Sequence, residues 1–416
     1  MNFIKTSFLS GLSTGISLLA RLISTKIVAV YLGTNGMFLL GQLKDFLRLS
    51  NTISSFGIEN GIVKYVAEFE EQKENLSNII GTSFRINITS AFFVSLAILA
   101  FKNQISPFLQ IDFDENFYFF LLIISVISAS IHTCFLSIYN GLNRIKLFVI
   151  VNIISNIVSA VILVLFVLKM QIIGAFYALV VNQILSLIIN IIFYTVYKPF
   201  LIQWIFKKYI NDYFKKLSSF SIMAIVGPVC LIISSFIVRD YLYDKFGADY
   251  AGSWEAMWRI SAIYLLFLIT TFKFYLIPTF SKLNDIELKK EVFKIWKIVI
   301  PIIILITTAV YFSKNIIINL LLSNEFILIN SIIFFHLIGD IIKINCWVLG
   351  NIMISKAKTK SFVFFQIEWS LVFVTLTYIF IEKYGFVGVS ISYFVTYIIH
   401  FSLLNIYFKK LLWINK

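Results

Sequence analysis

Long apolar segments recur along almost the whole chain and constrain its fold more than any other feature. A helix needs about 20 predominantly apolar residues to cross a bilayer, and the mean hydropathy of the 416 residues is +0.91. Only 13% of the residues are charged, too few for a water-exposed surface, because soluble chains carry about 25%. The apolar runs are continuous rather than alternating, which argues against a membrane β-barrel. The sequence therefore predicts an all-α polytopic membrane protein.

We predict twelve transmembrane helices, which would place both termini on one side of the membrane. Basic residues outside the spans concentrate on the side of the N-terminus, for example at Lys207, Lys208 and Lys409. The opposite loops are predicted to hold few, among them Arg239. Since cytoplasmic loops carry the excess of Lys and Arg, both termini are predicted to be cytoplasmic. The approximate spans are 6–32, 37–67 (bent at Gly57), 79–102, 116–140, 147–168, 173–197, 217–238, 250–281, 292–313, 325–353, 362–382 and 386–408.

Weak internal similarity indicates two halves of equal size. A Gly-x6-Arg pattern followed by an aliphatic residue and Ser occurs at 41–50 and again at 252–261. Between the halves, segment 199–216 carries lysines opposite apolar residues at helical spacing, which predicts an amphipathic helix on the inner leaflet. We therefore predict an N-terminal six-helix bundle at 1–198, this cytoplasmic linker at 199–216, and a C-terminal six-helix bundle at 217–416. Such repeats typically place a substrate site at their interface.

Charged residues at membrane depth are the main functional signal, because each costs about 2.5–3.5 kcal/mol to insert. The basic ones are Arg21, Lys26, Lys44, Arg48, Lys64, Arg85, Arg259, Lys273 and Lys343. The acidic ones, which are fewer, are Asp45, Glu59, Glu255, Asp340 and Glu368. Ion pairing within the membrane, as between Glu255 and Arg259 or between Asp340 and Lys343, remains an alternative explanation for each pair. The surplus of positive charge predicts a wet cavity that accepts an anion.

Two spans carry polar side chains at helical spacing. In the second span the spacing predicts one continuous polar face, formed by Lys44, Arg48, Thr52, Ser55 and Glu59. In the tenth span His336, Asp340 and Lys343 form a similar stripe. His132 and His400 are lone histidines in apolar runs, for which packing is the favoured interpretation over function.

Several functional classes lack support in the sequence. The chain has no GxxxxGK[ST], HExxH or GxSxG motif. Cys134, Cys230 and Cys346 lie in apolar runs without metal-binding spacing. The net charge of +14 follows from cytoplasmic loops and does not require a nucleic-acid partner. No cofactor or metal is expected, and transport is favoured over catalysis.

Patches along nearly the whole chain resemble a known family. They are residues 57–61 (Gly-Ile-Glu-Asn-Gly) with Lys64-Tyr65, residues 275–283, Gly339-Asp340 with Lys343, and residues 350–357. These patches resemble the Wzx polysaccharide flippases, especially the O-antigen and lipid III translocases. The wider exporter superfamily, abbreviated MOP, includes the lipid II flippase MurJ and the MATE drug exporters.

The resemblance implies two six-helix bundles around a central cationic cavity. It implies a flippase for undecaprenyl pyrophosphate carrying an oligosaccharide, such as an O-antigen repeat unit in lipopolysaccharide biosynthesis. The protein would move this lipid to the periplasmic leaflet of the bacterial inner membrane by alternating access. Its partners would be a polysaccharide polymerase and a chain-length regulator, and the transport unit would be a monomer. A MATE-type drug/cation antiporter and a polysaccharide polymerase are the alternatives.

The candidate site residues follow from the charge pattern and the resemblance together. The substrate-binding candidates are Arg21, Lys26, Lys44, Arg48, Lys64, Arg259 and Lys273. The candidates for ion coupling or gating are Glu59, Glu255, Asp340, Lys343 and Glu368. The coupling could use an ion gradient, since no nucleotide-binding motif is present.

Overall fold

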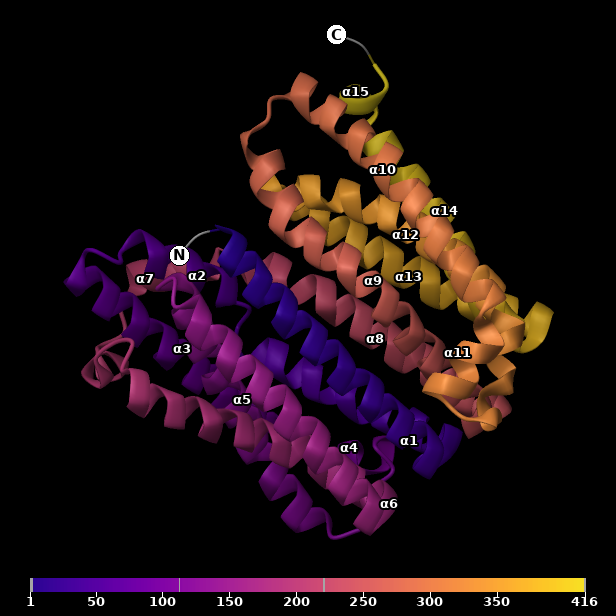
Figure 1. Ribbon diagram of the computed structural model, residues 1–416, viewed down its shortest axis with the longest axis horizontal. Helices are drawn as coiled ribbons and strands as arrows, with labels where there is room; N and C mark the ends of the chain where they lie inside the picture. Colours follow the sequence, from indigo (N-terminus) through magenta and orange to yellow (C-terminus); the bar gives the residue numbers. More distant parts are fainter. Residues whose placement is uncertain (1–2, 112, 220, 415–416) are drawn as a thin grey trace. The chain divides into compact units, whose positions relative to one another are not determined.

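The chain is helical wherever it has regular structure in the part described by the computed structural model (Figure 1). That part comprises residues 3–111, 113–219 and 221–414, with side chains from residue 14 onward except those of 267, 270, 271, 273 and 274. Within it, eight helices are long and apolar enough to cross a membrane. The prediction of an α-helical multi-pass membrane protein is therefore confirmed.

Two of the helices are long enough to cross a membrane twice. Helix α1 spans Phe3–Ser54 and is kinked at Gly33, where φ is +62°; helix α6 spans Ile145–Tyr197 and is kinked at Gln171. At about 1.5 Å per residue, such a helix is about 80 Å long, against about 30 Å of hydrocarbon. The kinks coincide with the predicted boundaries between spans one and two and between spans five and six. The total of twelve crossings stays a prediction.

The chain forms two compact units. The first contains residues up to Leu32 together with Leu39–Val229. Its helix α5 packs against α2, α3 and α6, and aromatic rings of Phe84, Phe135 and Tyr194 contact one another in its core. Besides α1 and α6, its elements are α2 (Glu59–Glu68), α3 (Lys73–Ala100), α4 (Lys102–Phe108), α5 (Glu115–Gly141), η1 (Ile202–Phe206) and α7 (Asn211–Ser218).

The second unit contains Gly33–Phe38 and the chain from Cys230 onward. Its central helix α12 packs against α9, α10 and α14, and α14 also packs against α13. Its larger elements are α8 (Ser221–Phe246, which begins in the first unit), α9 (Ala248–Lys282), α10 (Asp285–Phe312), α12 (Ile329–Ser355), α13 (Thr359–Tyr384) and α14 (Gly388–Tyr407). The short ones are α11 (Lys314–Leu321), η2 (Asn324–Leu328), η3 (Gly385–Val387) and α15 (Lys409–Leu412).

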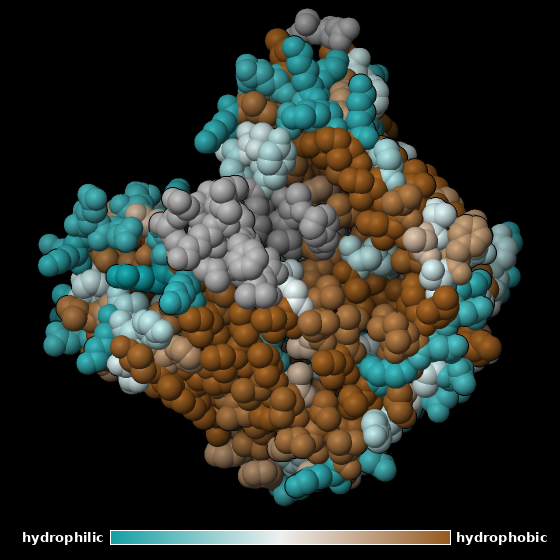
Figure 2. All heavy atoms as spheres, viewed as in Figure 1, coloured by the Kyte–Doolittle hydropathy of each residue, from teal (hydrophilic) through white to brown (hydrophobic). Residues whose placement is uncertain are grey.

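Large apolar side chains cover the outer flanks of the helices. Figure 2 shows hydrophobic residues along these flanks and hydrophilic residues gathered at helix ends. Phe93, Leu305 and Phe312 are among the exposed ones. A soluble protein rarely exposes apolar patches of this extent, so these flanks are the surfaces that face lipid.

The prediction of one continuous amphipathic helix at 199–216 is wrong, because the segment is interrupted. The segment consists of the short 3-10 helix η1, an extended stretch at 207–210, and α7. Arg85 of α3 explains the break, because its guanidinium donates to the carbonyls of Phe206 (3.3 Å) and Lys207 (2.6 Å). These carbonyls would otherwise accept bonds within a helix. Gly81 allows the approach, since a Cβ atom there would lie 2.8 Å from the Trp204 carbonyl oxygen.

The predicted continuous polar face of the second span is also wrong. Helix α1 ends at Ser54 and α2 begins at Glu59, and between them Phe56 and Gly57 adopt positive φ angles of 53° and 61°. Lys44, Arg48 and Thr52 therefore belong to one helix, while Glu59 belongs to another. The predicted bend at Gly57 is confirmed, and it is sharp enough to end the helix.

Candidate functional site

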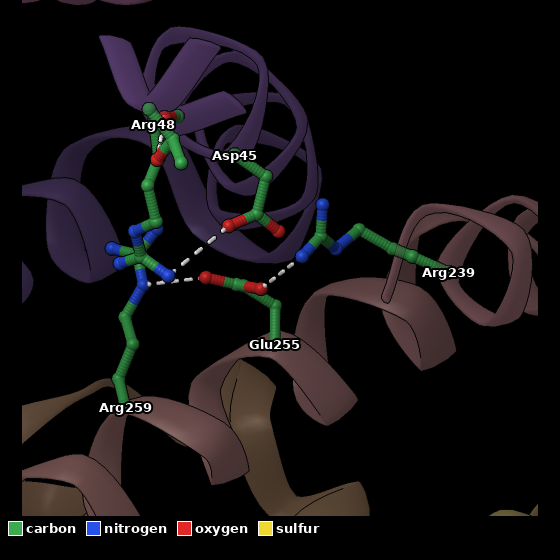
Figure 3. A network of polar contacts seen from close by, with 6 residues as sticks. Asp45, Arg48, Arg239, Glu255 and Arg259 are labelled. Atoms are coloured by element: carbon green, nitrogen blue, oxygen red, sulfur yellow. Dashed lines mark hydrogen bonds and ion pairs between the residues drawn. The ribbon is translucent and has the colours of Figure 1, made fainter. Parts of the chain in front are cut away.

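A carboxylate shared between two arginines forms the most distinctive polar cluster of the second unit. Glu255 of α9 accepts from Arg239 Nη2 of α8 at 2.8 Å and from Arg259 Nε at 3.0 Å, one bond on each carboxylate oxygen (Figure 3). The predicted pair of Glu255 with Arg259 is thus confirmed, with a second arginine added. Two guanidiniums therefore contact one carboxylate within a largely apolar unit.

The sequence did not identify Arg239 as part of a site. It was predicted in an outer loop, but it lies within α8, and its side chain is only 2% exposed. Its guanidinium carbon also lies 5.9 Å from the ring centroid of Trp254, within cation–π range. Arg239 is therefore a buried partner of Glu255, and its position near the end of an apolar run concealed this role.

Arg259 keeps part of its hydrogen-bonding capacity available. Its Nε is bonded to Glu255, while Nη1 and Nη2 are buried and have no hydrogen-bond partner among the residues that the structure describes. The side chain is 13% exposed. Leaving charged donors without acceptors is costly, and the pair of Nη atoms has the fork geometry that binds phosphate or carboxylate oxygens. Arg259 is therefore well suited to bind an anion.

Asp340 and Lys343 of α12 form a second, closed cluster. Lys343 Nζ lies 3.6 Å from Asp340 Oδ1 and donates to the Tyr393 hydroxyl at 2.9 Å. The hydroxyl of Tyr393 donates to Asp340 Oδ1 at 2.7 Å, and the hydroxyl of Tyr264 donates to Oδ2. His336 Nε2 is 3.9 Å from Oδ2. The predicted pairing of Asp340 with Lys343 is confirmed, and both oxygens of this fully buried carboxylate are occupied.

Aromatic rings surround the ammonium group of Lys343. Its Nζ lies 4.8 Å from the ring centroid of Trp258, 5.2 Å from Trp347, 5.5 Å from Tyr393 and 6.0 Å from Tyr397. Such rings stabilise a cation by their negative faces. Together with Asp340 they satisfy a charge that would otherwise be very costly to bury.

Glu368 of α13 has a histidine as its partner. His400 Nδ1 of α14 lies 2.6 Å from Glu368 Oε2, while Oε1 is buried without a hydrogen-bond partner in the described part of the chain. The side chain of Glu368 is 10% exposed and that of His400 is 9% exposed. His400 was interpreted from the sequence as a packing residue, and this contact gives it a polar partner. Since the two residues are 32 positions apart on different helices, no local pattern could reveal it.

In the first unit, Arg48 forms an ion pair with Asp45. Its Nη1 lies 3.6 Å from Asp45 Oδ1, one turn back on α1 (Figure 3), and its side chain is 61% exposed. Arg21 is also exposed, Lys44 and Lys26 are half-buried, and all three lie on α1. An exposed pair of this kind contributes little to stability, so Arg48 is available for other contacts.

Two further candidates lie on α2, and one lies outside the described side chains. Lys64 is exposed, with its Nζ 4.8 Å from the ring centroid of Tyr65, and Glu59 is half-buried. Lys273 falls in α9, but its side chain is outside the described part. The structure thus joins Glu255 with Arg259 and Asp340 with Lys343, and adds Arg239 and His400. In the described residues, no three His, Cys, Asp or Glu side chains gather as they would around a metal ion.

Comparisons with known proteins point in one direction. A family model described as polysaccharide biosynthesis protein matches residues 3–284. The lipid III flippases of Escherichia coli (strain K12) and Shigella flexneri are each 27% identical over 411 residues, covering 97% of both chains. A solved multidrug resistance MATE family transporter of the MOP superfamily, in its inward-facing conformation, has a TM-score of 0.79 at 12% identity over 95% of each chain. These matches confirm the resemblance inferred from the sequence, and the last one confirms a MATE-like helical fold.

Proposed function

The chain belongs to the polysaccharide biosynthesis protein family, and on this basis we propose that it is a flippase for an oligosaccharide linked to a polyprenyl diphosphate. The carrier would be undecaprenyl pyrophosphate, and the sugar an O-antigen repeat unit or a similar oligosaccharide. The names of the related lipid III flippases support this substrate class. The lipid moves from the cytoplasmic to the periplasmic leaflet by alternating access, as the resemblance implies.

The observation that carries this proposal is the pair of buried Arg259 Nη atoms that lack a hydrogen-bond partner among the described residues. A diphosphate presents several negatively charged oxygens, and a guanidinium can bind two of them in parallel. Nη1 and Nη2 of Arg259 lack partners in the described part of the chain, and Arg239 adds a second positive charge on Glu255. A drug that is itself a cation would be repelled by the Arg259 guanidinium. The cluster therefore favours an anionic lipid headgroup over the cationic cargo of a drug antiporter.

The remaining candidates have subordinate roles in this proposal. Further contacts to the diphosphate come from Arg21, Lys26, Lys44, Arg48, Lys64 and Lys273. Glu59, Glu255, Asp340, Lys343 and Glu368 couple the cycle to an ion gradient or control gating. Among them Glu255 orients Arg259, because it holds the Nε atom and leaves the other two nitrogens available.

The proposed setting is the bacterial inner membrane. Twelve crossings with both termini in the cytoplasm agree with the distribution of basic residues, since the lysine-rich ends of α7 and α10 then lie inside. The six-helix bundles at 1–198 and 217–416 act as the two moving halves of a monomeric transport unit. A polysaccharide polymerase and a chain-length regulator use the flipped product.

Complementation tests the proposal in cells that lack their own flippase. Arg259→Ala and Arg48→Ala are expressed at verified membrane levels, and surface polysaccharide is measured by gel. We expect each to reduce polysaccharide at least about tenfold, since a charge-assisted contact contributes about 1.5–3 kcal/mol. Lys410→Ala, which removes an exposed lysine from α15, is the matched control and should restore it fully. Full restoration by both arginine variants would contradict an anion-binding role.

The knockout phenotype separates the alternatives. Loss of a flippase leaves no repeat units on the surface lipid, whereas loss of a polymerase leaves single units. Single units in the knockout would therefore indicate the enzyme. Increased drug sensitivity with intact polysaccharide would indicate the antiporter.

A further inference from the structure

The carboxylates of Glu255, Asp340 and Glu368 are balanced in different ways. Glu255 faces two arginines, and Asp340 faces Lys343 and two tyrosine hydroxyls. Both carboxylates therefore have a permanent cation beside them. Glu368 instead contacts His400, which is a cation only when both ring nitrogens carry a proton. The charge of this pair consequently depends on how many protons it holds.

We propose that Glu368 and His400 together bind the proton that drives transport in the function proposed above. The 2.6 Å separation of Nδ1 and Oε2 is a hydrogen-bond distance, so a hydrogen lies between the two atoms. A bare nitrogen lone pair facing a carboxylate oxygen at that distance would be repulsive. The pair is suited to bind a proton rather than a metal ion, because Nδ1 and Oε2 are already within hydrogen-bond distance of each other.

Proton bookkeeping makes the pair a switch. Neutral Glu368 with neutral His400, and carboxylate with imidazolium, contain the same number of protons and carry no net charge. Removing one proton leaves a carboxylate beside a neutral imidazole, which is a buried negative charge without a counterion. That state is costly in the interior of the unit and becomes affordable only when water reaches the pair. Proton release is therefore linked to a conformation that opens the region around α13 and α14.

The surroundings support this assignment. Phe365 packs on the imidazole with ring centroids 5.9 Å apart, and Tyr397 lies at 6.4 Å. The Cys346 thiol of α12 is close enough to interact electrostatically with Glu368. Cys346 and Tyr397 are thus titratable neighbours of the pair, and neither is a cation. The unpartnered Oε1 gives water one place to bind when the region opens.

Reconstituted protein in liposomes tests the proposal. The full chain is supplied with a short-chain polyprenyl-diphosphate oligosaccharide, and flipping is measured with and without an imposed pH gradient while a lumenal dye reports pH. In Glu368→Gln and His400→Gln, the factor by which the pH gradient accelerates flipping should fall at least about tenfold, which is a typical size for coupling between sites. Exchange of the lipid between leaflets without a gradient is measured in parallel, and the acceleration is expressed relative to this basal rate of each variant. His132→Gln is the control and should respond as the wild type does. His132 belongs to the first unit, where its imidazole contacts Asn190 of the same unit.

A second variant covers the case in which the glutamine variants do not fold. His400→Lys supplies a permanent cation, as Lys343 does for Asp340, so the buried charge stays balanced. This variant should fold and exchange lipid but ignore the pH gradient. A wild-type response in His400→Lys or in both glutamine variants would overturn the proposal. The proposal would also be overturned if flipping were accelerated by a sodium gradient while the pH is the same on both sides of the membrane.

A measurement without substrate separates this inference from the flippase proposal. Infrared difference spectra of the purified protein between acidic and alkaline buffer should contain a carboxylic-acid signal that Glu368→Gln removes. If that signal is present and no lipid is flipped, the flippase proposal fails while the proton site stands. If lipid is flipped and the signal survives in Glu368→Gln, the proton site is wrong.

Discussion

Two ionic clusters of the second unit differ in how completely their charged groups are paired. Around Asp340, one lysine, two tyrosine hydroxyls and four aromatic rings use up the charges and hydrogen bonds almost completely. Around Glu255, two arginines share one carboxylate, and Arg259 retains nitrogens without partners among the described residues. The comparison indicates that the carboxylate and ammonium groups of the Asp340 cluster are occupied by one another and by their neighbours, whereas the Glu255 cluster retains donors that can bind an anion.

The largest effect on stability is expected from Lys343→Met. It leaves fully buried Asp340 without a cation, and breaking a buried pair from one side costs about 3–5 kcal/mol. The double variant Lys343→Met with Asp340→Asn should recover most of this loss, because neither charge remains. Detergent-induced unfolding followed by tryptophan fluorescence measures both free energies. A single variant as stable as the double variant would show that Asp340 does not depend on Lys343.

A smaller effect is expected from Arg239→Met. Glu255 then keeps Arg259, so the carboxylate remains compensated, and the substitution removes the charge-assisted hydrogen bond from Arg239, worth about 1.5–3 kcal/mol. In a Glu255→Gln background the same substitution should cost less, since the ionic contact is already gone. The test is this double-mutant cycle, measured by the same unfolding assay. Additive costs would mean that Arg239 stabilises the unit through Trp254 rather than through Glu255.

The clusters also show which contacts a sequence can predict. Glu255 with Arg259 and Asp340 with Lys343 are one helical turn apart, so helical spacing alone brings each pair together. The long apolar runs likewise predicted the helices and their approximate bounds, because a bilayer demands about 20 apolar residues per crossing. The bend at Gly57 was predictable because glycine tolerates the positive φ it adopts there.

Contacts between helices could not be predicted in this way. Arg239 meets Glu255 across α8 and α9, and His400 meets Glu368 across α13 and α14. Both depend on how helices pack, which spacing along one helix does not encode. The linker failed for a similar reason, since tertiary bonds from Arg85 to two carbonyls outweigh the local preference for a helix. The sequence therefore predicted the elements well and the site only where it is local.

The smallest effect on stability is expected from Arg259→Ala, and this prediction tests the comparison most directly. Glu255 retains its bond to buried Arg239, and Arg259 loses a single pair at the edge of the cluster. We expect a cost below about 1 kcal/mol, because the loss of the bond to Glu255 is offset by the removal of two buried donors that lack acceptors in the described part of the chain. The same substitution is expected to abolish most transport, because the donors that it removes are the ones available to a diphosphate. A large loss of stability with transport retained would instead show that Arg259 stabilises the unit and does not bind the substrate.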